Sequence, residues 1–304
     1  MNICHYSARD GKRLMYRWFE SAGSQLTLIC LHGSTFDSLR YAMLARVLAM
    51  RGVHVCLPDW RGHGDSEGTP GDIDYETQLQ DDLADLIAHL KKQGRKAFVV
   101  GGHSAGAVIA LRFCALYNLP EVQGYFAIAP PFTQTDETRK FDYSGGAFEY
   151  RIRYGRAKRH WRLPDDSTLQ YTPKLNGIAY TLAKCLPFLR SMKVMRFPMV
   201  GEPKHNANRV LAYSYRLLSA YSIQQYPKLL EALTVPVCVV VGDDDEVVEA
   251  DTLESLINWY IGPSVPVEYT VVSNSKHMTV VNPAAAILAN WLREQLFDRW
   301  GAVA

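Results

Sequence analysis

Short, continuously apolar runs alternate along the chain with segments whose apolar positions recur every three or four residues. Continuous apolar runs are typical of strands that are buried on both faces of a parallel sheet. Six such runs are present, at residues 27–31, 54–58, 98–102, 125–129, 237–242 and 267–272. An opening segment, residues 4–20, predicts two further strands around Asp10-Gly11, a dipeptide that favours a hairpin. The pattern therefore predicts a mostly parallel sheet of eight strands.

The segments between these runs have helical periodicity. In residues 75–92, four leucines recur at spacings of four, three and four, with acidic residues near the start and lysines at the end. Strands that alternate with such helices predict an α/β fold with helices on both faces of the sheet. Further helices are expected at residues 105–117 and 283–300, and around an apolar stripe of Leu39, Met43 and Val47.

The alternation stops after Pro130-Pro131 and resumes at about residue 233. Between residues 131 and 232 the pattern predicts no buried parallel strand, and the segment carries 17 basic and 8 acidic residues. Its formal charge of +9 contrasts with −7 for the remainder, and it holds 15 of the 34 aromatic residues. We therefore predict a core formed by residues 1–130 and 233–304 and an inserted unit at 131–232.

Composition narrows the classes of function. A net charge of +2 gives no support for nucleic-acid binding, and the first residues lack the basic and apolar regions of a signal peptide. No apolar run reaches the length of a membrane-spanning helix. A cytoplasmic protein is therefore expected. Its cysteines are scattered without metal-ligand spacing, which favours reduced thiols: Cys4, Cys30, Cys56, Cys114, Cys185 and Cys238.

Residues 99–108 place a serine between a predicted strand and a predicted helix. In Gly102-His103-Ser104-Ala105-Gly106, the small residues on either side of the serine allow strand and helix to approach closely. A tight turn of this kind exposes the serine side chain. Ser104 is therefore the predicted nucleophile, with a glycine-rich structural turn as the alternative interpretation.

A serine hydroxyl needs a base within hydrogen-bonding reach and a carboxylate that orients this base. His277 follows the last predicted strand and precedes the final helix, at the sheet edge where doubly wound folds form their sites. We predict His277 as the base, with His32 and His103 as alternatives because both lie in glycine-flanked loops. The carboxylate is expected directly after the strand at 237–242, where spacing alone leaves three residues open: Asp243, Asp244 and Asp245.

An acyl-transfer site also needs two backbone N–H groups that bind the oxyanion. One is expected from Ala105, which follows the candidate nucleophile. The other is expected in the loop after the strand at 27–31, where glycine at position 33 permits an unusual backbone. Ser34 is the predicted donor in this loop, with Thr35 as the second choice.

Five motifs in this order resemble the α/β-hydrolase superfamily: LHGST, PDWRGHGDSEG, GGHSAG, VVGDDDEVV and SKHMT. The chain is most similar to the branch that contains lysophospholipases, monoacylglycerol lipases and related serine esterases. The resemblance covers the predicted core and implies an α/β-hydrolase fold in which the insertion forms a largely helical cap. It also implies that Asp59 and Arg61 pair beside the site.

The resemblance further implies the acid and the chemistry. The acid of this family lies three residues after the glycine that ends its strand, so Gly242 selects Asp245, followed by Asp244 and then Asp243. Ser104 would attack an acyl carbonyl while His277 takes its proton, with no metal or organic cofactor. Family members that act on haloalkanes or epoxides carry aspartate where Ser104 stands, which argues against those activities.

We therefore predict a carboxylic ester hydrolase for a lipid-like or medium-chain acyl ester of the monoacylglycerol or lysophospholipid type. The alternatives are a thioesterase, an aminopeptidase with the same triad, and a non-catalytic ligand receptor. An aminopeptidase needs carboxylates that bind the amine of its substrate. The basic charge of the insertion argues against this alternative. Residues 186–200 mix apolar and basic side chains, which indicates either a cap helix packed on the core or a surface for an anionic membrane.

Overall fold

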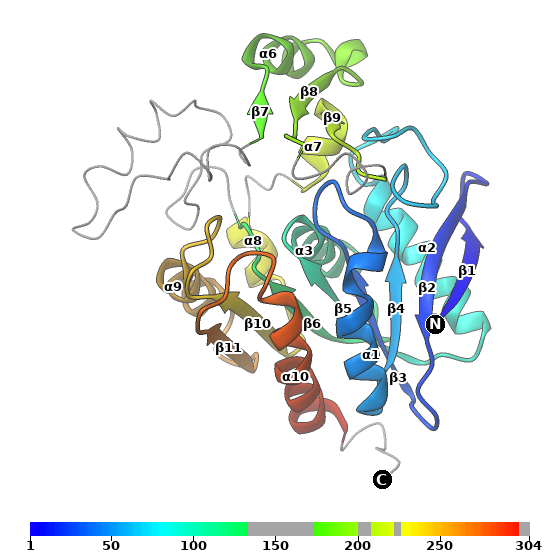
Figure 1. The fold of residues 1–304 in the computed structure, drawn as a ribbon, viewed down its shortest axis with the longest axis vertical. Coiled ribbons are helices and arrows are strands. Elements are labelled where there is room, and N and C mark those ends of the chain that lie inside the picture. Colours follow the sequence, from blue (N-terminus) through cyan, green and yellow to red (C-terminus); the bar gives the residue numbers. More distant parts are fainter. Residues whose placement is uncertain (133–172, 200–207, 222–225, 298–304) are drawn as a thin grey trace.

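The main sheet of the computed structural model, which describes residues 1–132, 173–199, 208–221 and 226–297, has eight strands. Their order is β1-β2-β4-β3-β5-β6-β10-β11 (Figure 1). β2 is antiparallel to β1 and β4, and all other neighbours are parallel, so the predicted mostly parallel sheet is confirmed. The strands are β1 (Asn2–Ser7), β2 (Arg13–Phe19), β3 (Leu26–Leu31), β4 (His54–Pro58), β5 (Ala97–His103), β6 (Val122–Ile128), β10 (Val237–Gly242) and β11 (Val267–Val272).

Helices cover both faces of this sheet (Figure 1). On one face lie α1 (Ala42–Met50) and α10 (Val281–Leu292), which contact each other. The other face is covered by α2 (Gln78–Lys92), α3 (Ala105–Tyr117) and α9 (Ala250–Tyr260). A short π-helical turn, η4 (Arg293–Phe297), continues α10. The helix predicted at 105–117 is present with the same ends as α3, and those predicted at 75–92 and 283–300 correspond to α2 and α10 with shifted starts. Residues 298–300 lie outside the described residues.

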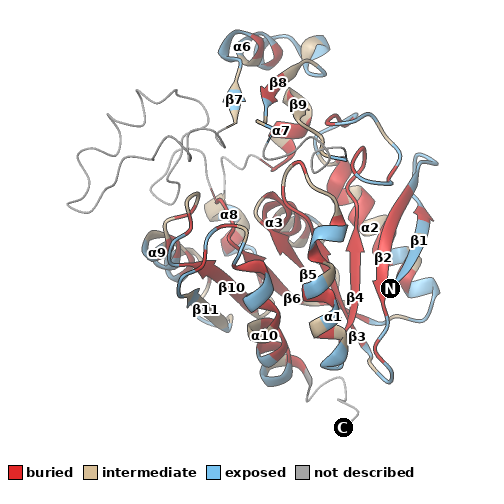
Figure 2. Ribbon diagram, viewed as in Figure 1, coloured by how far each residue is buried: buried red, intermediate tan, exposed pale blue. Residues whose placement is uncertain are grey.

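Alternate side chains of the central strands enter two separate apolar cores. Val100 of β5 packs on the side of α2 and α3, whereas its neighbour Val99 packs on the side of α1 and α10. Because both faces are covered, every residue of β3, β4, β5 and β10 is buried (Figure 2). This burial explains why the sequences of these strands are continuous apolar runs and do not alternate between apolar and polar residues.

The apolar stripe predicted for the first helix is wrong. Leu39 and Met43 are 51% and 53% exposed, and α1 instead buries Leu44, Ala45 and Leu48. Leu39 lies outside α1, in a 3₁₀ turn, η1 (Ser38–Tyr41), that precedes the helix. Inside α1, Met43 is exposed and Val47 is half-buried against the core, so the buried face lies beside the predicted stripe.

Between β6 and β10, the described residues form a small three-stranded antiparallel sheet with helices beside it, above the carboxyl ends of the parallel strands (Figure 1). Much of the predicted insertion, residues 133–172, 200–207 and 222–225, lies outside the described residues, and the division of the chain into two units stays a prediction. The elements are β7 (Lys174–Leu175), α6 (Gly177–Cys185), η2 (Pro187–Leu189), β8 (Lys193–Arg196), β9 (Ala212–Ser214), α7 (Tyr215–Tyr221) and α8 (Tyr226–Glu231).

Residues 186–199 do not form the cap helix that the sequence suggested. Pro187 begins a single 3₁₀ turn, and the chain then enters β8, which buries Val194 and Met195. Val200, the last residue of the predicted helix, lies outside the described residues. A proline at the start and strand pairing with β9 replace helical hydrogen bonds here, so the basic residues of this stretch do not share one helical face.

All six cysteines are free thiols. Cys30, Cys56 and Cys238 are buried in the strands of the main sheet, and burial raises the pKa of Cys30 to about 12. Cys185, at the end of α6, is exposed. Among the residues that the structure describes, every helix is too short or too polar to cross a bilayer.

Candidate active site

Ser104 lies at the sharp turn between β5 and α3. Its backbone has φ +52° and ψ −125°, a conformation that non-glycine residues rarely adopt. The Ser104 N–H donates to the carbonyl of Ile128 (2.9 Å), and the Ala107 N–H donates to the carbonyl of Ser104 (3.0 Å). These two bonds hold the strained turn, which leaves the Ser104 side chain only partly buried.

The glycines beside Ser104 allow α3 to begin directly against β3. A Cβ atom on Gly106 would lie 2.3 Å from the carbonyl oxygen of Leu31, and one on Gly102 would lie 2.5 Å from the same oxygen. Both distances are far below van der Waals contact, so any side chain would push the start of α3 away from β3. The close approach brings the loop after β3 next to Ser104.

Ser104, His277 and Asp245 form one hydrogen-bonded row. The Oγ atom of Ser104 lies 3.0 Å from Nε2 of His277, and Nδ1 of His277 lies 3.0 and 3.1 Å from the two carboxylate oxygens of Asp245. His277 follows β11 and Asp245 follows β10, so the three side chains come from the carboxyl ends of three parallel strands. The N–H groups of Val247 and Val248 also donate to Asp245 Oδ1.

The electrostatics fix the protonation of this row. Burial alone would raise the pKa of Asp245, but His277 and the two backbone donors hold it below its usual value. Burial lowers the pKa of His277, whereas the carboxylates of Asp245 and Glu246 raise it by more, so the net shift is upward. An ionised Asp245 requires the proton on Nδ1, which leaves the lone pair of Nε2 facing the Ser104 hydroxyl.

The neighbouring acidic residues have different contacts. Asp243 Oδ1 accepts the N–H of Ser275 at 3.2 Å, and Glu246 Oε2 accepts the N–H of His277 at 3.0 Å. Asp244, the second choice for the acid, is exposed. Sequence reasoning missed Glu246. Its position directly after Asp245 was a signal, but the contact with His277 depends on how two loops meet.

The two alternative bases do not face Ser104. His103 accepts the hydroxyl proton of Tyr41 at Nδ1 (2.9 Å) and donates from Nε2 to the carbonyl of His277 (2.8 Å). Burial, reinforced by the nearby His277, lowers the pKa of His103 to about 3. His32 stacks on Trp60 with ring centroids 4.4 Å apart, and both of its nitrogens bond to backbone. His103 is therefore neutral with both ring nitrogens bonded, and both ring nitrogens of His32 are bonded to backbone groups, so neither ring is placed to accept the Ser104 proton.

In the loop after β3, the N–H groups on either side of Ser34 are already bound. The Gly33 N–H donates to the hydroxyl of Tyr41 (2.8 Å), and the Thr35 N–H donates to the hydroxyl of Tyr213 (2.6 Å). Within the described part of the chain, the N–H groups of Ser34 and Ala105 have no protein acceptor. Thr35, the second choice as oxyanion donor, therefore has its N–H occupied.

The predicted ion pair between Asp59 and Arg61 is wrong. Asp59 accepts instead from Arg17 (3.2 Å) and from the N–H of Ser38 (2.7 Å). A Cβ atom on Gly64 would lie 2.0 Å from the Asp59 carboxylate, so this turn wraps closely around Asp59. Arg61 extends in another direction and pairs at 2.6 Å with both of its carboxylate partners, which are Asp82 of α2 and Asp10 of the β1–β2 turn.

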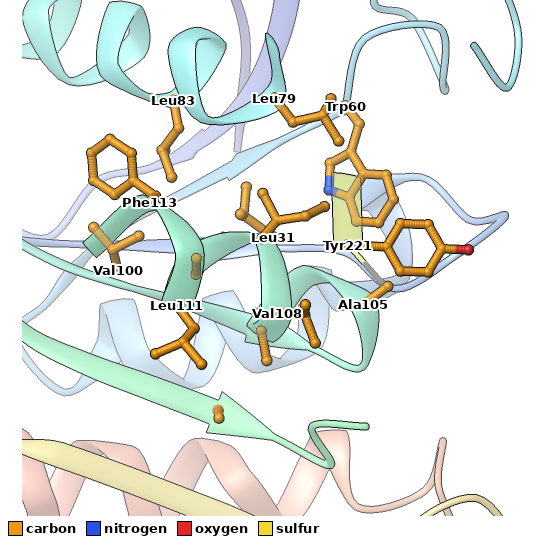
Figure 3. Packing of buried hydrophobic residues seen from close by; sticks show 14 of the residues in the cluster. Leu31, Trp60, Leu79, Leu83, Val100, Ala105, Val108, Leu111, Phe113 and Tyr221 are labelled. Atoms are coloured by element: carbon orange, nitrogen blue, oxygen red, sulfur yellow. The ribbon is translucent and has the colours of Figure 1, made fainter. Parts of the chain in front are cut away.

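Aromatic side chains from two parts of the chain lie near the start of α3. Trp60, from the loop after β4, and Tyr221, from α7, have ring centroids 6.4 Å apart and belong to the same apolar cluster as Ala105 (Figure 3). Tyr221 also lies 6.0 Å from the ring of Tyr213. Buried apolar and aromatic side chains therefore pack beside the start of α3.

The row of side chains, the strained turn and the sheet order agree with a comparison to known families. A model of the family described as serine aminopeptidase, S33, matches residues 23–170, which include the loop of Ser34 and the turn of Ser104. The chain has the α/β-hydrolase fold, and this family model matches just under half of it. The motif order, from LHGST to SKHMT, had indicated this fold.

Curated relatives of this α/β-hydrolase include a lipase and a peptidase. It is 31% identical to a lysophosphatidylserine lipase of Danio rerio over 141 residues, which are 43% of this chain and 35% of the lipase. The chain thus spans about a third of that relative's length. It is 24% identical to a proline iminopeptidase of Saccharolobus solfataricus over 285 residues, which are 90% of this chain and 86% of the peptidase.

Among solved structures, a soluble variant of the monoglyceride lipase of Saccharomyces cerevisiae, in complex with a substrate analog, has the same fold. The TM-score is 0.67 at 17% identity, and the match covers 95% of this chain and 94% of the lipase chain. At this identity the likeness establishes the fold alone. Because these similar proteins include lipases and a peptidase, the fold by itself does not decide the function of this chain.

Proposed function

We propose that the protein is a serine hydrolase that cleaves carboxylic esters through an acyl-enzyme on Ser104. The observation that carries the proposal is the row in which Ser104 Oγ lies 3.0 Å from His277 Nε2 and His277 Nδ1 lies 3.0 Å from Asp245. Both distances are those of a nucleophile, its base and the group that orients the base.

In the proposed reaction, Ser104 Oγ attacks the acyl carbonyl while its proton passes to His277 Nε2. Asp245 accepts the hydrogen bond from the Nδ1–H of His277 and stabilises the imidazolium that forms. The N–H groups of Ser34 and Ala105 bind the negative oxygen of the tetrahedral intermediate. His277 then protonates the leaving alcohol, and a water molecule deprotonated by His277 releases the acyl group from Ser104.

The proposed substrate is a lipid-like or medium-chain acyl ester, of the monoacylglycerol or lysophospholipid type. The apolar and aromatic cluster around Trp60 and Tyr221 beside Ala105 supports an acyl chain rather than a polar acyl group. The similarity to a lysophosphatidylserine lipase supports the same class.

An aminopeptidase is the second candidate function. It is supported by the match of the proline iminopeptidase to 90% of this chain. Such an enzyme needs a carboxylate that binds the substrate's amine. Near the site, Asp245 and Glu246 already hold His277, and Asp243 holds the Ser275 N–H. No second observation favours a thioesterase or a ligand receptor over these two functions.

The test compares wild type and Ser104→Ala on three substrate types: nitrophenyl esters of graded chain length, acyl-CoA and aminoacyl amides. We expect hydrolysis of medium-chain esters by wild type, with a loss of at least about a thousandfold in kcat for Ser104→Ala. A fluorophosphonate probe should label wild type at Ser104. Preferential cleavage of aminoacyl amides or of acyl-CoA would replace the ester proposal, and absence of labelling in folded protein would overturn serine catalysis.

We also propose that the inserted segment contacts an anionic membrane surface through α6 and η2. Ile178 and Phe188 are both 77% exposed, and Leu182 is 42% exposed. Lys184 and Arg190 lie in the same stretch, and the whole segment from 131 to 232 has a formal charge of +9. Exposed apolar side chains surrounded by basic ones favour peripheral binding to anionic lipid.

A further inference from the structure

Thr35, next to the candidate oxyanion donor Ser34, is held on three sides by the segment at residues 209–213. The Thr35 N–H donates to the hydroxyl of Tyr213 at 2.6 Å, and its carbonyl accepts the N–H of Val210 at 3.1 Å. The Arg209 guanidinium donates to Thr35 Oγ1, at 2.9 and 3.2 Å. The N–H, the carbonyl and the hydroxyl oxygen of Thr35 are thus all bound by residues from the segment between β6 and β10.

These contacts hold an unfavourable backbone. Thr35 has φ +70°, and a positive φ is costly for a β-branched residue. The strained conformation persists only if its surroundings enforce it. If the Thr35 N–H lost its acceptor, the peptide between Ser34 and Thr35 could rotate, and the change in the Ser34 backbone would displace the Ser34 N–H, the candidate oxyanion donor.

The Tyr213 hydroxyl is itself oriented from the other side. It lies 2.8 Å from Nε2 of His63, and His63 Nδ1 donates to the carbonyl of Arg61 at 3.1 Å. Burial lowers the pKa of His63 to about 3, so the ring is neutral and Nε2 accepts. The hydroxyl proton therefore points to His63, and the oxygen lone pairs remain available to the Thr35 N–H.

A second tyrosine holds the loop at its other end. The Gly33 N–H donates to the hydroxyl of Tyr41, so two hydroxyl groups occupy the N–H groups on either side of Ser34. Tyr41 lies in η1 of the core, whereas Tyr213 lies in β9. The N–H of Ser34, between these two, has no acceptor among the described residues.

We propose that Tyr213 is a positioning residue for the oxyanion hole, and that the inserted segment thereby sets the geometry of the hole as well as lying above the site. The proposal rests on the proposed serine-hydrolase function. Tyr213 acts through the peptide of Thr35 and does not itself touch the reacting atoms.

Tyr213→Phe tests this role because it removes the hydroxyl alone. The ring would stay packed against Phe197, 4.9 Å away between centroids. We expect the rate of fluorophosphonate labelling at Ser104 to fall by about tenfold to a hundredfold, less than or similar to the loss of one direct oxyanion donor. On an ester, kcat should fall by a similar factor with little change in KM, and a trifluoromethyl ketone should bind correspondingly more weakly.

Tyr125→Phe is the matched control. It also removes one buried hydroxyl, which donates to the carbonyl of Ala107 at 2.9 Å, without touching the loop at 33–35. Thermal unfolding of both variants separates lost stability from lost positioning. Equal labelling rates for Tyr213→Phe and wild type, or equal rate losses for both tyrosine variants, would overturn the inference. If wild type itself is not labelled, the proposed function fails first and the inference fails with it.

Discussion

At the scale of single residues, the adjacent carboxylates of Asp245 and Glu246 bind different groups of His277. Asp245 bonds to the imidazole at Nδ1, while Glu246 accepts the backbone N–H of the same residue at 3.0 Å. Both charges raise the pKa of His277 against the effect of burial. Glu246 therefore influences the base twice, through the position of its backbone and through its charge.

Glu246→Gln separates these two effects, since glutamine keeps an oxygen that accepts the N–H but loses the charge. The pKa of His277 should fall. The base acts only when neutral, so the acid limb of the kcat/KM profile should move to lower pH. Hydrolysis of a nitrophenyl ester by wild type and variant between pH 5 and 9 measures this shift. Asp244→Asn, which alters an exposed carboxylate, should shift the limb less, and coincident profiles for Glu246→Gln and wild type would contradict the expectation.

Much of the site could be predicted from residue order. The turn around Ser104 and the spacing from Gly242 to Asp245 pointed to side chains that the structure places together with His277. The partners of Asp59 and Arg61 could not be predicted, because they depend on where Arg17, Asp82 and Asp10 lie after folding. The contact of Tyr213 with Thr35 could not be predicted either, since the two residues are 178 positions apart in the sequence.

At the scale of elements, the contact between α3 and β3 is the one that brings the candidate nucleophile to the oxyanion loop. The long buried strands could be predicted because burial on both faces leaves a clear apolar run. The strands β7, β8 and β9 could not, because each has only two to four residues and no readable period. The predicted stripe of α1 was wrong because Leu39 belongs to the separate 3₁₀ turn before the helix and Met43, inside the helix, is exposed.

Gly106→Ala tests the contact between α3 and β3. The new methyl group would lie 2.3 Å from the Leu31 carbonyl and 2.6 Å from that of His32, both rigid backbone atoms. We expect a loss of about 2–3 kcal/mol in the free energy of unfolding, measured by urea denaturation, together with loss of esterase activity. Gly177→Ala at the start of α6 adds a methyl group where nothing lies within 4 Å, so its stability and activity should match wild type. Unchanged activity in Gly106→Ala would mean that the elbow tolerates displacement of α3.

At the scale of the whole molecule, α6 and η2 expose apolar side chains above the main sheet, among them Ile178, Leu182 and Phe188. Figure 2 shows exposed residues on α6, which lies farthest from the core strands. The segment is tied to the core near the site through residues 209–213 and through Arg216, whose guanidinium lies 2.7 Å from the carboxylate of Asp72. A membrane contact at α6 would thus be coupled to the loop that carries Ser34.

Sedimentation with vesicles tests the proposed membrane contact. Wild type should pellet with vesicles that contain phosphatidylglycerol more than with phosphatidylcholine alone, and high salt should weaken this binding. The double variant Ile178→Ser, Phe188→Ser should lose most of it. Trp259→Ser, which removes an 81% exposed side chain from α9, is the control and should bind like wild type. Equal binding to both vesicle types would contradict the proposal.

The distribution of thiols makes Cys185 a suitable site for a fluorescent label. Cys185 is exposed on α6, while the thiols of Cys30, Cys56 and Cys238 are buried within the main sheet. A maleimide fluorophore would therefore reach Cys185 well before these three buried thiols unless the chain unfolds, and Cys4 and Cys114 are exposed less than Cys185. Such a dye would sit three residues from both Leu182 and Phe188, so its emission would report the polarity around α6 without any engineered cysteine.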